Sequence, residues 1–348
     1  MNKPFALVVL AFVISGNSIV SQELGSMHFA NMSIGMTSHG TVYTWGLNDH
    51  GQLGDETTID KLLPIPVLKG AYAGTHLLGD DPQNKIIMVS QGRSHSIALS
   101  KSGKVFTWGD GSVGQIGNGG SGTETSPESV SSSFSAFINS DSDNRLIAIT
   151  AGSHTSFALS TDGTAFSWGY NVFGQLGDST TINRFRPVRI LKGQYPGTEF
   201  LGDDSNNKIK SIVSSTWASM AVVQDGTAYS WGYNNDGQLG NGIGGTCLIP
   251  SQVLKGEYEG VTFLGDNSEN KIISIALGST HAIALTENGE VYTWGSNDNG
   301  QLGINLDNFN GIRTTPRRVL AGEYDGTAYI GDNPDNRIVK VSAGSAHC

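Results

Sequence analysis

Apolar and polar residues alternate along the chain in five short runs that each end in a Trp-Gly pair. A period of two, in segments rich in aromatic and β-branched residues, predicts β-strands rather than helices. A glycine opens each run and is often preceded by Asp, Asn or Ser, which is the chemistry of a hairpin turn. The five predicted strands are residues 41–45, 104–108, 164–168, 227–231 and 290–294.

The runs belong to an internal repeat with nearly constant spacing. Each Trp-Gly pair is followed by Gly-Gln-Leu-Gly or Gly-Gln-Ile-Gly, then in most repeats by a Pro-x-x-Val-Leu-Lys-Gly-like segment and a further apolar strand. Four short strands per repeat without a helical period are typical of a propeller blade. The sequence therefore predicts an all-β propeller of four-stranded blades with five repeats. The repeats are about 63 residues long and are marked by Trp45, Trp108, Trp168, Trp231 and Trp294.

The two ends of the repeat region match each other. Residues 33–37 align with the last strand of a repeat at residues 96–100, and residues 344–348 align with residues 92–96. Pairing of the N- and C-terminal strands would close the ring and remove its free edges. The alternative is that the chain is a fragment of a longer array, because it stops without a capping element.

The N-terminus is predicted to be a secretory signal peptide. Lys3 precedes a ten-residue apolar run at 5–14, and small residues follow up to Ser21. That order of charge, apolar run and small residues is typical of a signal, while ten residues are too few to span a bilayer. The predicted organisation is a signal at 1–21 and one propeller domain at 22–348, secreted to the exterior or to a periplasm. The alternative is an ordinary hydrophobic first strand or helix.

The charge and the cysteines narrow the classes of partner. The net charge is −10, so binding of nucleic acid by bulk electrostatics is not expected. Cys247 and Cys348 belong to no metal-ligand motif, and a disulfide between them is a minor possibility. No membrane span, metal or cofactor is predicted.

The repeat resembles that of the regulator of chromosome condensation family. It is also similar to repeats of a secreted bacterial beta-lactamase-inhibitor protein and of tubulin-suppressor-like proteins. Gly-x-Val-Tyr-x-Trp-Gly-x-Asn-x-x-Gly-Gln-Leu-Gly and Ala-x-Gly-x-x-His-x-x-Ala-Leu carry the resemblance over residues 33–348. It implies seven-bladed propellers, so a fragment of a seven-bladed ring is the alternative to a closed ring of five. Guanine-nucleotide exchange on a small GTPase is the activity that the resemblance implies.

Candidate chemistry is sparse. His95, His281 and His347 share one repeat position, and a residue repeated in separate blades is expected to serve the architecture. The repeated Asp/Asn loops, such as 79–86, offer oxygen ligands for calcium, but Asx-turns explain them without a metal. No nucleophile motif is present, so no enzymatic activity is predicted.

Binding is the remaining function, and the stretches between Gln-Leu-Gly and Pro vary most from repeat to repeat. Variable loops on a repeated scaffold are typical recognition surfaces. Two basic clusters in these stretches are candidate anchors for an anionic protein partner, with solvated loop charges as the alternative. The first hypothesis is a secreted, non-enzymatic interaction scaffold; the alternatives are a guanine-nucleotide exchange factor and a carbohydrate-active propeller enzyme. The candidate binding residues are Arg184, Arg186, Arg189, Arg313, Arg317 and Arg318.

Overall fold

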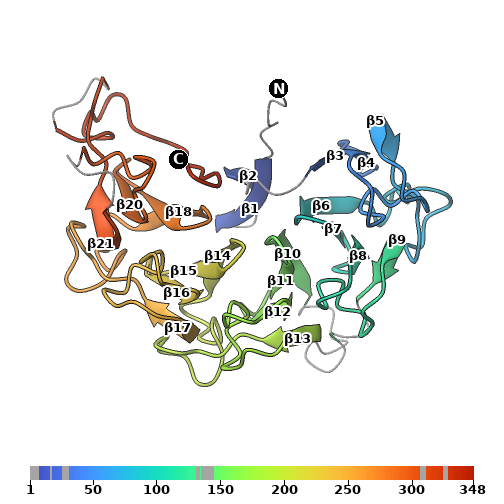
Figure 1. Ribbon diagram of the computed structural model, residues 1–348, viewed down its shortest axis with the longest axis horizontal. Coiled ribbons are helices and arrows are strands. Elements are labelled where there is room, and N and C mark those ends of the chain that lie inside the picture. The colour runs from blue at the N-terminus through green and yellow to red at the C-terminus, as the bar shows by residue number, and fades with distance from the viewer. Residues whose placement is uncertain are drawn as a thin grey trace. The chain divides into compact units, whose positions relative to one another are not determined.

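The elements named among the described residues are short β-strands, and these strands form antiparallel sheets (Figure 1). The computed structural model describes residues 8–15, 18–25, 31–130, 134, 145–305, 311–323 and 328–348. The strands are β1 (Val8–Ser15), β2 (Ser18–Gly25), β3 (Met32–Met36), β4 (Val42–Gly46), β5 (Lys61–Pro66), β6 (Ile86–Gln91), β7 (His95–Ser100), β8 (Val105–Gly109), β9 (Glu124–Ser129), β10 (Leu146–Ala151), β11 (Thr155–Ser160), β12 (Ala165–Gly169), β13 (Arg184–Arg189), β14 (Ile209–Ser214), β15 (Ala218–Val223), β16 (Ala228–Gly232), β17 (Cys247–Gln252), β18 (Ile272–Leu277), β19 (His281–Thr286), β20 (Val291–Gly295) and β21 (Arg313–Arg318).

The sheets follow the repeats. Four sheets have four strands in chain order, β6 to β9, β10 to β13, β14 to β17 and β18 to β21, and the sheet of β3, β4 and β5 has three. The chain forms two compact units, which are described separately. The N-terminal unit is Phe29–Val172 with Thr181–Ile190, and the C-terminal unit is Met1–His28 with Phe173–Thr180 and Leu191–Cys348. The all-β propeller architecture predicted from the repeat is confirmed.

The outer strand of each sheet begins earlier than the sequence suggested. β5, β9, β13, β17 and β21 each start three residues before their proline, inside the stretches expected to be variable loops. An outer strand pairs on one side only, so it tolerates proline and needs no regular alternation of apolar residues. The sequence signal for these strands is therefore weak, and the last three residues of each predicted loop belong to an edge strand.

The segment predicted to be a signal peptide lies on β1, which pairs with β2 in register from Val8↔Gly25 to Ser15↔Ser18. The hairpin crosses the predicted boundary at residue 21. A signal peptide is defined by its removal, which the conformation does not report, so the signal stays a prediction. Among the described residues, no helix is long and apolar enough to cross a membrane.

The core lies between consecutive sheets. One cluster in the N-terminal unit joins Val42 and Val67 of the first sheet region to Ala98 and Trp108 of the next sheet. A cluster in the C-terminal unit joins Met220 and Val253 to Ala282 and Trp294 in the same way. A sheet in this chain is therefore stable only when a second sheet covers its face, as expected of a repeat architecture.

The Trp of each Trp-Gly pair connects its sheet to the preceding repeat by a hydrogen bond. The indole Nε1–H donates to the backbone carbonyl of the Gln in the preceding Gly-Gln-Leu/Ile-Gly turn, and the four indoles that do so are fully buried. The pairs are Trp108–Gln52 (2.9 Å), Trp168–Gln115 (3.0 Å), Trp231–Gln175 (2.9 Å) and Trp294–Gln238 (2.9 Å). A serine one strand away donates to the same carbonyl in three of the four interfaces: Ser96, Ser156 and Ser219.

The second glycine of the Gly-Gln-Leu-Gly turn is required by the same contact. A Cβ at Gly54 would lie 2.8 Å from the Nε1 of Trp108, and one at Gly240 would lie 2.7 Å from the Nε1 of Trp294. Both glycines also have positive φ, +73° and +66°, which larger residues adopt at a cost. The motif Trp-Gly-x-Asn-x-x-Gly-Gln-Leu-Gly thus encodes both sides of the interface between repeats.

The first sheet departs from the prediction. It has three strands instead of four, and β3 pairs with β4 alone. Residues 338–343, the expected partner of β3, form no strand. Pairing of the N- and C-terminal strands, which is one of the two possibilities for the ends of the repeat region, stays a prediction. Residues 344–348 instead hydrogen-bond to the last sheet region, where the N–H of Ser279 donates to the carbonyl of Ser345 (3.2 Å).

We expect the indole hydrogen bond to contribute more to the free energy of unfolding where the Gln carbonyl accepts no second hydrogen bond. Trp294→Phe should lower the free energy of unfolding by about 3 kcal/mol, because the buried Gln238 carbonyl then loses the indole donor. Trp231→Phe should cost about 2 kcal/mol, since Ser219 still donates to Gln175. Trp45→Phe, at a partly exposed indole, is the control and should cost under about 0.5 kcal/mol. Chemical denaturation measures all three, and equal losses would contradict this account.

Candidate functional site

Three aromatic side chains form a partly exposed cluster at one end of the C-terminal unit. The ring of Phe173 lies edge-on between Trp217, at 5.3 Å between centroids, and Tyr233, at 5.2 Å. The N–H of Tyr233 donates to the carbonyl of Trp217 (2.9 Å), which fixes the two loops that carry these rings. Phe173 follows β12, Trp217 lies in the turn between β14 and β15, and Tyr233 follows β16. We call these three residues the aromatic trio.

The aromatic trio occupies three repeat positions whose side chains change from one repeat to the next. One position precedes the second strand of a sheet, one follows the Trp-Gly pair, and one precedes the glycine before Gln-Leu-Gly. The position before the glycine comes from one repeat, and the other two positions come from the next repeat. The Trp, Gly, Gln and Asn around these positions stay nearly constant. The equivalent sets are His50, Ser94 and Asp110; Val113, His154 and Tyr170; Phe173, Trp217 and Tyr233; and Asp236, Thr280 and Ser296.

The other sets are more polar. In the N-terminal unit, Asp110 accepts hydrogen bonds from the N–H of Ser112 and from Nε2 of Gln115, both at 2.9 Å. The ring of His154 lies 6.3 Å from that of Tyr170. In the C-terminal unit, burial and the nearby charge of Asp298 raise the pKa of Asp236. One scaffold position therefore presents an aromatic, a histidine or a carboxylate depending on the repeat.

The histidines that share one repeat position, His95 and His281, are buried, unlike the residues of the variable sets. His95 is fully buried, its Nε2 lies 2.9 Å from Oγ of Ser156 in the next sheet, and burial lowers its pKa to about 3. His281 is also fully buried, and burial lowers its pKa to about 4. Both imidazoles are neutral at physiological pH and belong to the interfaces between repeats. His154, one position earlier, is partly exposed and belongs to the variable set.

The first predicted arginine cluster lies on β13 of the N-terminal unit. Arg184 and Arg189 are its first and last residues and are partly buried, while Arg186 between them is exposed. A Cβ at Gly119 would lie 2.5 Å from Nη2 of Arg186, so this guanidinium packs against the turn of the preceding repeat. The three residues lie on one strand at the edge of a sheet, whereas the sequence placed the cluster among the variable loops.

The second cluster lies on β21 of the C-terminal unit and is paired with carboxylates. Nη1 of Arg317 lies 2.6 Å from Glu257, and Nη2 of Arg318 lies 3.2 Å from Glu290 and also contacts Asp332. The Arg318 guanidinium stacks 4.4 Å from the ring centroid of Tyr329. Nη1 of Arg313 donates to the carbonyl of Ile312. These ion pairs largely offset the positive charge that an anionic partner would require.

The repeated Asp loops hold their carboxylates against backbone donors. Asp80 accepts from the N–H groups of Thr75, His76 and Leu77 at 2.8–2.9 Å and from the Thr75 hydroxyl at 2.7 Å. These bonds outweigh burial and lower the pKa of Asp80 to about 2. Asp203 has the same partners in its own loop. Within the part of the chain that the structure describes, no three His, Cys, Asp or Glu side chains converge as metal ligands.

Neither cysteine takes part in a disulfide. Cys247 is partly buried on β17, and Cys348 is exposed at the end of the chain. The minor possibility of a bond between them is therefore wrong for this structure.

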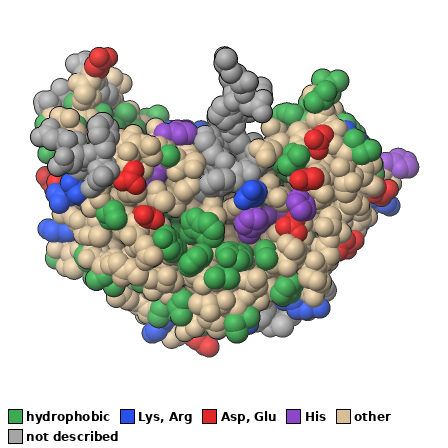
Figure 2. All heavy atoms as spheres, viewed as in Figure 1, with side chains coloured by type: hydrophobic (Ala, Val, Ile, Leu, Met, Phe, Trp, Pro, Cys, Tyr) green, Lys and Arg blue, Asp and Glu red, His purple; other side chains and the backbone are tan. Residues whose placement is uncertain are grey.

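One tryptophan could have pointed to the aromatic trio from the sequence. The chain has six tryptophans, and Trp217 is the one outside the five Trp-Gly pairs. It aligns with Ser94, His154 and Thr280, so a large apolar side chain replaces small or polar ones at one repeat position. On the face seen in Figure 2, hydrophobic side chains gather in exposed groups between scattered charges.

The repeated sheets, their indole-linked interfaces and the variable loop positions define a β-propeller repeat protein. The chain matches the model of the RCC1-like domain over residues 3–348. It therefore belongs to the RCC1-like domain family, which confirms the resemblance seen in the repeat.

Curated relatives share the repeat within longer proteins. The ultraviolet-B receptor UVR8 of Arabidopsis thaliana is 27% identical over 90% of this chain, and the match covers 61% of UVR8. The E3 ubiquitin-protein ligase HERC2 of Homo sapiens is 29% identical over 90% of this chain, which corresponds to 5% of HERC2. The chain thus spans less than two thirds of the length of these relatives.

Solved structures agree on the fold. Human WBSCR16 aligns with a TM-score of 0.63 at 24% identity, covering 90% of this chain and 69% of that one. Prp20p of Saccharomyces cerevisiae, whose structure was described with its binding properties to Gsp1p and histones, aligns with a TM-score of 0.60 at 24% identity. That alignment covers 83% of this chain and 61% of Prp20p. At this identity the likeness shows the fold alone.

We expect Asp80 to make stability depend on acid pH. Its folded pKa of about 2 lies below the ordinary value, so its stabilisation is present above pH 4 and is lost as the pH falls towards 2. Asp80→Asn should lower the unfolding free energy at pH 7 by about 1–2 kcal/mol, after allowance for solvent screening. The difference between wild type and variant should shrink below pH 3. Urea denaturation at pH 7, 4 and 2.5 measures it, and a constant difference would contradict the assignment.

Proposed function

We propose that this chain is a non-enzymatic protein-interaction scaffold that recognises its partner through the variable loop positions, with the aromatic trio at the centre of the contact. The observation that carries the proposal is the partly exposed packing of Phe173, Trp217 and Tyr233 at repeat positions where most of the equivalent side chains are polar. Trp and Tyr dominate the energetics of protein interfaces because they bury large areas with few rotatable bonds.

The surroundings of the trio favour a partner with a basic side chain. Asp236 follows Tyr233 in the same loop, and Asp298 lies close enough to raise its pKa. An arginine of the partner would stack on the aromatic rings and reduce the repulsion between the two carboxylates. The chain's net charge of −10 favours the same kind of partner over an anionic one. We rank the aromatic trio above the arginine clusters, because Glu257 and Glu290 form ion pairs with Arg317 and Arg318 and reduce the positive charge of that strand.

The proposal includes secretion, which rests on the N-terminal sequence. Lys3, the apolar run at 5–14 and the small residues that follow support a signal peptide. Guanine-nucleotide exchange stays the alternative that family membership suggests, and it would require a cytosolic GTPase. A nucleotide-release assay on a panel of small GTPases separates the two, since acceleration would favour exchange.

We expect Trp217→Ala to abolish most partner binding. Quantitative affinity capture with the full chain as bait should recover at least one protein whose yield falls at least tenfold with Trp217→Ala, as for an interface hot spot worth about 2 kcal/mol. Circular dichroism should show both proteins folded, because Trp217 lies outside the indole-linked interfaces.

The matched control for this experiment is Ile243→Ala. Ile243 is a 61% exposed apolar side chain in the same unit, on a loop between Gln-Leu-Gly and proline. It should retain the partner at the wild-type level. Loss with Ile243→Ala and retention with Trp217→Ala would place recognition in the loops after Gln-Leu-Gly and would reject the aromatic trio.

A separate measurement tests secretion. When the full chain is expressed in a host with a secretory pathway, the mature protein in the medium should begin near residue 22. N-terminal sequencing reads this directly. An intact N-terminus on a protein retained inside the cell would reject secretion and leave the aromatic trio unaffected.

A further inference from the structure

The variable repeat positions of the N-terminal unit bring together four titratable or charged side chains. His50, Asp110 and His154 belong to the two variable sets of this unit, and Arg93 directly precedes a fourth variable position. The N–H of Arg93 donates to the carbonyl of Ser153 (2.9 Å), which holds the loop of Arg93 beside the loop of His154. These loops come from three consecutive sheets, those of β3–β5, β6–β9 and β10–β13. We call His50, Arg93, Asp110 and His154 the histidine cluster.

The carboxylate of the histidine cluster is buried and ionised. Asp110 is 8% exposed and accepts hydrogen bonds from the N–H of Ser112 and from Nε2 of Gln115. Burial by itself would raise the pKa of Asp110, but the hydrogen bonds from Ser112 and the charge of nearby His50 outweigh it and lower that pKa. A buried charge is screened weakly, so Asp110 acts strongly on the side chains around it.

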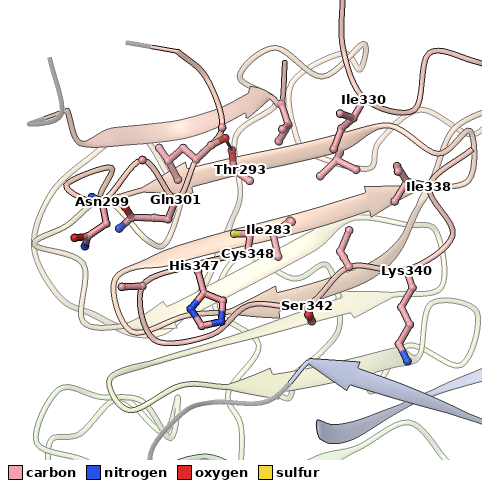
Figure 3. Close-up of a pocket in the computed structure, with 17 residues that line it drawn as sticks. Ile283, Thr293, Asn299, Gln301, Ile330, Ile338, Lys340, Ser342, His347 and Cys348 are labelled. Carbon is pink, nitrogen blue, oxygen red and sulfur yellow. Dashed lines mark hydrogen bonds between the residues drawn. The ribbon is translucent and has the colours of Figure 1, made fainter. Parts of the chain in front are cut away.

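His50 lies beside this carboxylate. It takes the repeat position of Phe173, and Asp110 takes that of Tyr233, and these two rings lie 5.2 Å apart in the C-terminal unit. Figure 3 shows the turn of His50 as it occurs in another repeat, where Asn299 takes its position and projects from the end of the strands. His50 is partly exposed, so its ring can meet both Asp110 and solvent.

His154 completes the cluster on the side of the following sheet. Its ring is partly exposed and lies 6.3 Å from that of Tyr170. Burial lowers the pKa of His154, the positive charges of Arg93 and His50 lower it further, and the carboxylate of Asp110 opposes them. The guanidinium of Arg93 is therefore close to this imidazole, and Arg93 itself is exposed.

A buried hydroxyl indicates that the ligand accepts hydrogen bonds. Ser153 is 3% exposed, and its Oγ has no hydrogen-bond partner. At the same repeat position in the C-terminal unit, Oγ of Ser279 lies 3.1 Å from Oγ of Ser345 in the neighbouring repeat. Side chains at this position thus face each other, and the counterpart of Ser153 is Arg93, whose guanidinium has donors only. An anion beside Arg93 would accept from the guanidinium and from the hydroxyl.

The charge of the cluster changes sign between neutral and mildly acidic pH. Besides Asp110, the exposed carboxylate of Asp49 lies 3.9 Å from Nε2 of His50. With both histidines neutral, two carboxylates and the guanidinium of Arg93 give a net charge of −1, and protonation of both imidazoles makes it +1. Histidines gain their charge between about pH 7 and 5. His95, the other imidazole nearby, is buried with a pKa of about 3 and stays neutral over this range.

We propose that the histidine cluster binds a carboxylate of an acidic protein segment under mildly acidic conditions. Arg93 and the hydroxyl of Ser153 donate to the bound carboxylate, while the protonated imidazoles offset the two carboxylates of the protein. A carboxylate keeps its charge down to about pH 5, whereas a phosphate monoester loses its second charge near about pH 6, as the histidines gain theirs. The cluster shares no residue with the aromatic trio and lies in the other unit, so it goes beyond the proposed function.

A labelled acidic peptide tests the proposal on the full chain. Fluorescence anisotropy with hexa-aspartate at constant ionic strength should give an affinity about tenfold higher at pH 5.5 than at pH 7.5. Hexa-asparagine, the uncharged probe of the same length, should not bind at either pH. His50→Asn combined with His154→Gln should reduce the gain to less than about twofold. Asp110→Asn should bind hexa-aspartate at pH 7.5 about tenfold more tightly than the wild type, because a repelling charge is removed.

The matched control removes two exposed histidines elsewhere in the same unit. His39→Asn combined with His76→Gln changes the titration of the whole chain equally and should keep the wild-type gain. An equal gain in both double variants would be a general charge effect and would reject the cluster, as would a wild type that does not bind at pH 5.5. Trp217→Ala should leave this binding unchanged, which separates it from the proposed function.

Circular dichroism at both pH values establishes which variants are folded. Should Asp110→Asn fail to fold, Arg93→Gln takes its place, since it changes an exposed side chain. It should weaken binding of hexa-aspartate at pH 5.5 about tenfold. Wild-type affinity in Arg93→Gln would overturn the proposal.

Discussion

The hydrogen bond from a buried indole to the Gln carbonyl of the preceding repeat is the constraint on which the rest of the structure depends. It requires tryptophan at one place, glycine at another so that the ring can approach, and a turn that leaves one carbonyl free. Because the interior excludes water, an unmade bond there costs more than the bond itself contributes. The motif is therefore nearly constant. It determines how one sheet packs on the next, whichever side chains the variable positions carry.

This constraint explains where variation is possible. Phe173, Trp217 and Tyr233 lie within a few residues of the constant Trp, Gln and Asn and pack on one another between consecutive repeats, yet none of them makes the indole hydrogen bond. The same positions carry His50, Ser94 and Asp110 in the first interface of the N-terminal unit. A rigid frame with exchangeable neighbours allows each repeat to present a different chemistry at an equivalent place.

Much of the fold could be predicted from the sequence, and the reason is the repetition. Five copies of Thr-Trp-Gly or Ser-Trp-Gly after an alternating run give the inner strands without ambiguity. The outer strands were missed in part, because Lys61–Pro66 and its counterparts pair on one side only and carry no alternation. The surroundings of the candidate arginines were harder to predict still. Arg317 and Arg318 look available in the sequence, but Glu257 and Glu290, some 60 and 28 residues away along the chain, neutralise them.

The terminal sheets show why a repeat protein cannot be understood from its motifs alone. Trp45 has the same sequence context as Trp231, yet one indole is partly exposed and the other is buried against Gln175. The difference lies in what covers the sheet, which no local pattern encodes.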